Sequence, residues 1–186
     1  MDRPSHLLLP ALAALLVATG TGVVRAAGEA SLFNAEGYRQ AHYRSPTPAH
    51  AVGAETLDTE GLRQLLERLP QTVLVDVYRR QWLHDRFIPD EDHRNLPGSL
   101  WLANTGDGQL VGQWSGYFSF HLEQATGHQK DWPLVFYCRS DCWLGWNAVK
   151  RAQQLGYTQL YWYRDGIDAW EQAGLPLQPA EPAALP

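Results

Sequence analysis

The stretch V135-F-Y-C-R-S-D-C-W-L-G-W146 decides the fold of this chain. It holds the only two cysteines, Cys138 and Cys142. An apolar run over 133–137 precedes them and has the pattern of a buried strand. From about Cys142 onward, apolar residues fall on one face of a helix that Gly156 would end. Cys138 is therefore expected between the end of a strand and the start of a helix.

The same alternation of strand and helix extends outward from this stretch. Apolar runs of the strand type cover 72–77, 99–102, 133–137 and 159–163, and helical spacing covers 59–69, 114–125, 142–155 and 165–170. This alternation predicts an α/β fold, a mainly parallel sheet flanked by helices. Ligand sites in such sheets lie beyond the carboxyl ends of the strands, where we expect Cys138.

The expected position of Cys138 favours a reactive thiolate. Unpaired N–H groups and the helix dipole lower the pKa of a cysteine at a helix N-terminus, and the thiolate is the form that attacks. Arg139 adds positive charge there, whereas Asp141 opposes it. Cys142, in the first helical turn, could reach Cys138. Two buried structural thiols are the alternative.

Length, charge and motif content bound the class of protein. A chain of 186 residues, 45% hydrophobic, can bury one core without a covalent staple. The net charge of −5 argues against a nucleic-acid binder. The cysteines form no C-x-x-C pair, and no Cys/His cluster has zinc spacing, so we expect neither a metal nor a cofactor.

The N-terminus has the composition of an export signal. Arg3 precedes the apolar segment L7-L-L-P-A-L-A-A-L-L-V-A18, which is too short to span a bilayer comfortably, and V24-R-A26 fits a cleavage site. We expect a signal peptide over 1–26, a periplasmic mature protein and no stable membrane insertion after cleavage. An uncleaved anchor is the alternative. In an oxidising compartment two nearby thiols tend to form a disulfide.

Three segments lie outside the alternating pattern. Residues 27–56, rich in Ala, Gly and Pro, predict an irregular N-terminal extension. Residues 178–186 predict a disordered tail. The polar segment 79–98 is typical of a loop, in which Arg79 and Arg80 are either anion binders or solvated ion pairs.

Several motifs resemble those of a rhodanese (sulfurtransferase) domain and occur in the same order. They are V75-D-V77, L96-P-G-S-L-W-L102, Y137-C-R-S140, L155-G-Y157, Y163-R-D-G-I-D-A-W170 and the AGLP stretch over 173–176. The resemblance covers residues 57–177 and implies a single rhodanese-like domain.

The resemblance also implies roles for the cysteine loop. In the family the loop cysteine takes sulfane sulfur from a donor, holds it as a persulfide and passes it on, which makes Cys138 the nucleophile and Cys142 its neighbouring thiol. Arg139, Ser140, Asp141 and Trp143 then form the substrate-binding loop. The implied partner is a small sulfur donor or a protein thiol.

The chain departs from the family pattern at three positions. Trp143 stands five residues after Cys138, where many members have an arginine, and Asn95 stands where many have a histidine. Cys142 beside a persulfide would attack it, release the sulfur and leave a disulfide. Thiol–disulfide exchange is therefore expected as an alternative to simple sulfur transfer.

The spacing C-x3-C-W, from Cys138 to Trp143, with W146-N-A148 behind it, resembles a narrower set of proteins. These are exported rhodanese-like proteins named for a Cys-x-x-Cys-Trp-type motif and associated with pyrroloquinoline-quinone-dependent alcohol catabolism. This resemblance implies a periplasmic quinoprotein dehydrogenase as partner. The alternative is a non-catalytic rhodanese fold that serves as a binding module, with Cys138–Cys142 as a local disulfide.

Overall fold

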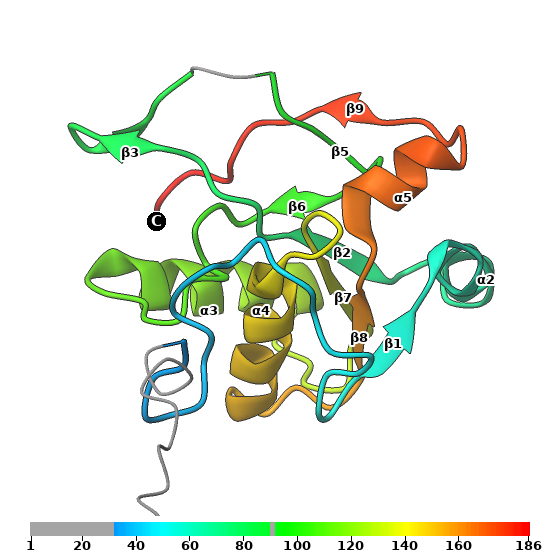
Figure 1. The fold of residues 1–186 in the computed structure, drawn as a ribbon, viewed down its shortest axis with the longest axis horizontal. Helices are drawn as coiled ribbons and strands as arrows, with labels where there is room; N and C mark the ends of the chain where they lie inside the picture. The colour runs from blue at the N-terminus through cyan, green and yellow to red at the C-terminus, as the bar shows by residue number, and fades with distance from the viewer. Residues whose placement is uncertain (1–31, 90–91) are drawn as a thin grey trace, which may run out of the picture.

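The computed structural model describes residues 32–89 and 92–186, so the signal peptide expected over 1–26 lies outside the described residues. A five-stranded parallel sheet forms its centre, with strand order β1-β8-β7-β2-β6 (Figure 1). Its strands are β1 (Glu55–Leu57), β2 (Val73–Asp76), β6 (Leu100–Trp101), β7 (Leu134–Tyr137) and β8 (Leu160–Tyr163). The flanking helices of the described chain are α2 (Thr59–Arg68), α3 (Gln113–Thr126), α4 (Trp143–Gln154) and α5 (Gly166–Gln172). The predicted α/β fold with a parallel sheet is confirmed.

Each face of the sheet has its own core. Side chains alternate along a strand, so Phe136 and Trp162 pack in the cluster formed with α3 and α4. Tyr137 and Tyr163 pack in the opposite cluster, formed with α2 and α5. Burial on both faces explains why these strands are continuous hydrophobic runs in the sequence. No helix in the described part of the chain combines the length and apolarity needed to cross a membrane.

Local chemistry fixes several helix ends. Asp58 caps α2 by accepting a hydrogen bond from the Gly61 amide at 2.7 Å, and Gly127 ends α3 in a left-handed conformation. The N-cap of α4 is Cys142, which makes no side-chain capping bond. The first amides of α4 therefore need other partners, and this requirement bears on the site.

The N-terminal extension packs across α4 (Figure 1, blue to cyan). The buried Asn147 side chain accepts from the Arg39 amide at 2.9 Å and donates to the Arg39 carbonyl at 2.8 Å, which fixes the extension to the helix. The extension is largely irregular, as predicted for 27–56. Its last residues, however, join Leu57 in the edge strand β1, which pairs with β8.

The tail and the segment 79–98 contain structure that was not predicted. The segment forms the hairpin β3 (Trp82–Leu83) and β4 (Arg86–Phe87), and then β5 (Arg94–Asn95), which pairs antiparallel with β9 (Gln178–Pro179) of the tail.

The prediction of disorder for 178–186 differs from the structure, where the tail lies against the domain. The Ala183 amide donates to the Trp101 carbonyl at 2.9 Å, and the Tyr117 hydroxyl donates to the Ala183 carbonyl at 2.9 Å. Composition indicated disorder because these partners lie more than sixty residues away in the sequence.

Candidate active site: the cysteine loop

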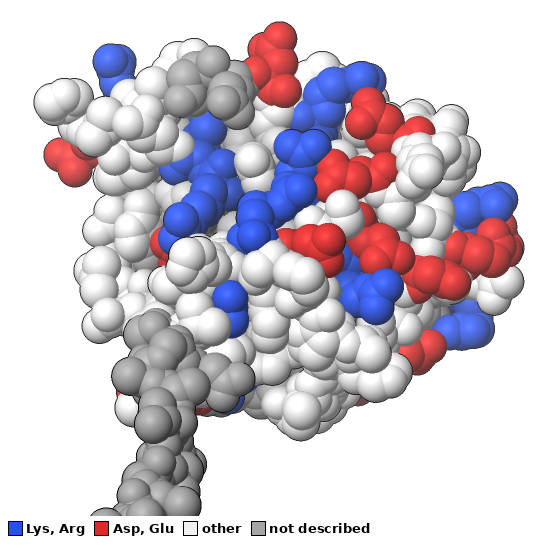
Figure 2. Space-filling model, in the orientation of Figure 1, with Lys and Arg blue, Asp and Glu red and all other residues white. Residues whose placement is uncertain are grey.

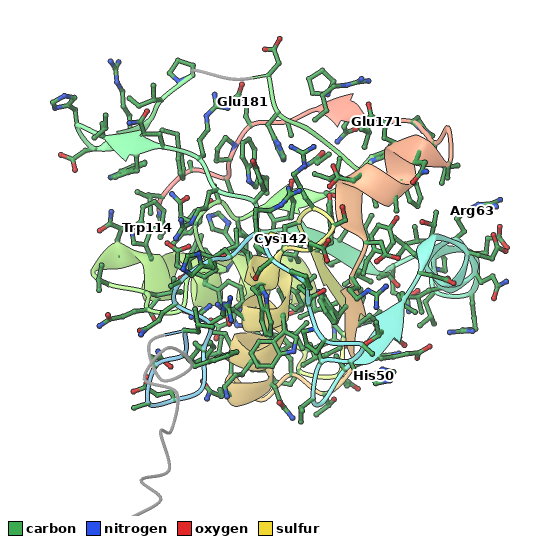
Figure 3. The ribbon with its side chains drawn as sticks, in the orientation of Figure 1. His50, Arg63, Trp114, Cys142, Glu171 and Glu181 are labelled. Atoms are coloured by element: carbon green, nitrogen blue, oxygen red, sulfur yellow. A yellow bond between two sulfur atoms is a disulfide. The ribbon has the colours of Figure 1, made fainter. Side chains whose placement is uncertain are left out.

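The site residues predicted from the sequence gather at the carboxyl end of β7. Cys138 follows the last residue of that strand, Cys142 precedes α4, and the two are joined in a disulfide with their Cα atoms 6.4 Å apart. Figure 3 shows Cys142 near the centre of the molecule, at the end of α4. The two cysteines are only 2% and 1% exposed, so the disulfide lies beneath the surface.

The start of α5 holds the loop from one side. Arg139 pairs with Gly166 in a β-bridge, and the Ile167 amide donates to the Cys138 carbonyl at 3.0 Å. Gly166 has a φ of +58°, and a Cβ there would lie 2.5 Å from the Cys138 carbonyl oxygen. The approach therefore requires a glycine, which explains the D-G turn in the sequence.

A carboxylate on α5 binds two of the predicted loop residues. Asp168 accepts from the Arg139 guanidinium at 2.9 and 2.7 Å, and from the Ser140 amide and hydroxyl at 3.0 and 2.8 Å. Burial acts to raise the pKa of Asp168, but the hydrogen bonds from Arg139 and Ser140 outweigh it and lower that pKa. Arg139 and Ser140 are therefore engaged within the protein.

Sequence reasoning missed Asp168 as a site residue. The signal was available, since Asp168 lies in the first turn of the short helix that follows the D-G turn. It became meaningful only when the fold placed that turn beside the cysteine loop.

The N-terminal extension covers the loop from another side, through a segment that we call the strap, residues 42–46. The Trp143 amide donates to the Tyr43 carbonyl at 2.9 Å, and the Ser45 amide donates to the Asp141 carbonyl at 2.9 Å. Between them Arg44 pairs with Cys142 in an antiparallel β-bridge. The strap thus provides the partner for the first amide of α4.

Side chains tighten this contact between the strap and the loop. The Trp143 indole N–H donates to the Ser45 hydroxyl at 3.1 Å, and the Arg39 guanidinium lies 4.9 Å from the centre of the Trp143 ring. Trp143, predicted as a loop residue, is 9% exposed and contacts the strap. The sequence gave no sign of the strap beyond its irregular composition.

A buried acid–imidazole pair lies beside the loop. Asp76, at the end of β2, is 2.6 Å from His93 Nε2, and the His93 ring stacks on Tyr78. Complete burial raises the pKa of Asp76, although the contact with His93 acts to lower it. His93 and Arg139 line a common cleft of about 190 Å³ with Leu177 and others.

Basic side chains gather on the face that carries the cysteine loop, with acidic ones beside them (Figure 2). Arg79 bonds Asp107 at 2.7 Å, and its guanidinium lies 4.4 Å from the centre of the Tyr43 ring. Arg80 donates to the Ile88 carbonyl. Of the two roles expected for Arg79, the structure therefore shows the ion pair.

An open parallel sheet with a cysteine loop between a strand end and a helix defines a class of α/β proteins with a thiol site. Residues 58–173 match the model of the rhodanese-like domain family. The chain therefore belongs to the rhodanese-like domain family. No curated protein matches it.

Solved structures share the fold at low identity. The polysulfide-sulfur transferase of Wolinella succinogenes is 18% identical, with a TM-score of 0.47, and the match covers 69% of this chain and 80% of that one. The thiosulfate sulfurtransferase of Pseudomonas aeruginosa is 14% identical, with a TM-score of 0.48 and coverage of 72% and 22%. A 3-mercaptopyruvate sulfotransferase of Escherichia coli is 15% identical, with a TM-score of 0.49 and coverage of 72% and 54%. These likenesses concern the fold alone.

Proposed function

We propose that this protein acts through Cys138 in sulfane-sulfur transfer or in thiol–disulfide exchange, with Cys142 as the resolving thiol. The disulfide between Cys138 and Cys142 carries this proposal. It joins the residue after a parallel strand to the N-cap of the next helix, where a thiolate is favoured once the bond is reduced. Membership of the rhodanese-like family supports the same kind of chemistry.

Both reactions use the same pair of cysteines. The Cys138 thiolate attacks the outer sulfur of thiosulfate, forms a persulfide and displaces sulfite. The Cys142 thiolate then attacks Cys138 Sγ, which forms the disulfide and releases hydrosulfide, so the two cysteines are oxidised and the sulfane sulfur is reduced. Two thiols from a donor reset the pair, since they become a disulfide as the cysteines regain their protons.

Mass analysis of the intact protein tests this proposal. The reduced chain should gain one sulfur on exposure to thiosulfate, or should return to the disulfide while hydrosulfide appears in solution. Cys138→Ser should abolish both outcomes, because a hydroxyl is a far weaker nucleophile than a thiolate at neutral pH. Reduced wild-type protein that shows neither change would rule out sulfane-sulfur transfer.

The burial of both cysteines favours a second candidate, a non-catalytic binding module. On this hypothesis the disulfide holds the loop in shape, and the strap closes over it permanently. A disulfide that small thiols cannot reduce in the folded protein would support this candidate and would exclude exchange.

Location and partner belong to the same proposal. The short apolar N-terminus and the C-x3-C-W spacing support an exported, periplasmic protein of the Cys-x-x-Cys-Trp-type set that serves a pyrroloquinoline-quinone-dependent dehydrogenase. N-terminal sequencing of the protein from the periplasmic fraction should begin near Ala27. Co-purification should recover a quinoprotein dehydrogenase, and recovery of the uncut chain from membranes would contradict export.

A further inference from the structure

Arg44 of the strap lies opposite Cys142. The two residues form an antiparallel β-bridge, and paired residues in such a bridge project their side chains to the same face. Cys142 projects into the disulfide, so the Arg44 side chain starts on the disulfide's side of the strap. Arg44 is nevertheless exposed, and its guanidinium reaches solvent beside the buried sulfur atoms.

Arg44 differs from its basic neighbours in what it binds. Arg79 is paired with Asp107, and Arg139 with Asp168. The Arg44 guanidinium makes no hydrogen bond, ion pair or ring contact with any residue that the structure describes. Its charge is therefore available to a molecule that approaches the disulfide. Asp141, in the same loop, is the acidic group that acts against it.

We propose that Arg44 is a specificity-determining residue that favours small thiols and sulfur compounds carrying a negative charge. The inference rests on the proposed thiol chemistry and names the substrate class for that site. Trp143 stands where a loop cation is common in the family, so this chain takes its cation from a segment outside residues 58–173. An unpaired guanidinium attracts an approaching anion, and salt screens that attraction.

Reduction of the Cys138–Cys142 disulfide by two small thiols provides the test. Mercaptoacetate carries a carboxylate and 2-mercaptoethanol is neutral. In each case one thiolate attacks a cysteine sulfur and displaces the other cysteine as a thiolate. A second thiolate then releases the small disulfide. The measured quantity is the ratio of the two reduction rates, anionic over neutral, followed by intact mass.

Four proteins make the comparison: wild type, Arg44→Gln, Arg44→Lys and Arg63→Gln. Arg63 is an exposed arginine on α2, far from Cys142 at the edge of Figure 3, and its loss changes the net charge equally. Arg44→Gln should lower the ratio about fivefold at low salt, the size expected for one exposed charge close to the reacting sulfur. Arg44→Lys should keep most of the ratio, Arg63→Gln should keep all of it, and 0.5 M salt should remove most of the difference, where the Debye length falls to about 4 Å.

The neutral thiol separates the possible failures. If 2-mercaptoethanol reduces every variant and the ratio stays constant, Arg44 does not select charge, while the proposed function stands. An equal fall of the ratio in Arg63→Gln would show a general charge effect and would also overturn the inference. If neither thiol reduces the folded wild type, the proposed exchange chemistry itself is wrong.

Discussion

At the scale of single residues, Cys142 decides which chemistry follows a persulfide on Cys138. The structure places Cys142 close enough to form the disulfide, so its thiolate can reach Cys138 Sγ. We predict that Cys142→Ser prolongs the lifetime of a Cys138 persulfide at least tenfold, because the internal attacker is lost. Timed mass spectra after thiosulfate loading measure that lifetime. Equal lifetimes in wild type and variant would make Cys142 a bystander.

Asp168 links the loop to acid stability. Its pKa in the folded protein lies below the ordinary value of 3.8, against the effect of burial, because Arg139 and Ser140 hydrogen-bond the ionised form. A depressed carboxyl pKa contributes stability that is present above the ordinary value and lost as the pH falls through the folded pKa.

We therefore predict that Asp168→Asn unfolds more readily at neutral pH, by about 1 kcal/mol. The difference from wild type should shrink below about pH 4, where wild-type Asp168 also becomes neutral. Urea denaturation at pH 7 and at pH 3 measures both free energies of unfolding. A difference that stayed constant between these pH values would show that the charge of Asp168 is not what stabilises the loop.

At the scale of elements, two segments enclose the cysteine loop, and α5 is one of them. We predict that Gly166→Ala lowers the free energy of unfolding by about 2–4 kcal/mol, because a Cβ at Gly166 meets the Cys138 carbonyl. Gly174→Ala is the matched control, with a φ of +70° but open space around its Cβ, and should cost only about 1 kcal/mol. Thermal and urea unfolding compare the two, and equal costs would argue against the close approach.

The strap is the other segment, and it should limit access to the disulfide. We predict that Ser45→Pro speeds reduction of the disulfide by 2-mercaptoethanol severalfold, because proline cannot donate to the Asp141 carbonyl. Ser45→Ala retains the backbone donor and loses only the hydroxyl that contacts Trp143, so its effect should be smaller. Reduction rates that match wild type in both variants would mean that the strap does not control access.

At the scale of the whole molecule, the tail adds to the stability of the domain. Residues 178–186 supply β9 and the hydrogen bonds to Trp101 and Tyr117. We predict that a chain ending at Leu177 loses about 1–3 kcal/mol of unfolding free energy, from those bonds and from the apolar contacts of Leu185. The disulfide should still form. An unchanged melting temperature would show that the tail contributes nothing.

The sequence by itself determined the order of the central elements and the place of the cysteines. Strand and helix periodicities are local, and the run before Cys138 and the helix after Cys142 appear in consecutive residues. The fold class therefore followed directly, as did the position of Cys138 at the carboxyl end of a parallel strand.

Only the tertiary structure decided what surrounds the disulfide. Asp168 meets the loop from 28 residues away, Ser45 contacts Trp143 from 98 residues away, and the tail reaches Tyr117 from 66. No local pattern encodes these contacts, since each depends on which strands become neighbours in the sheet. The burial of Cys138 and Cys142, and the place of Arg44 beside them, were settled at that level because the parallel sheet brings the loops to one edge.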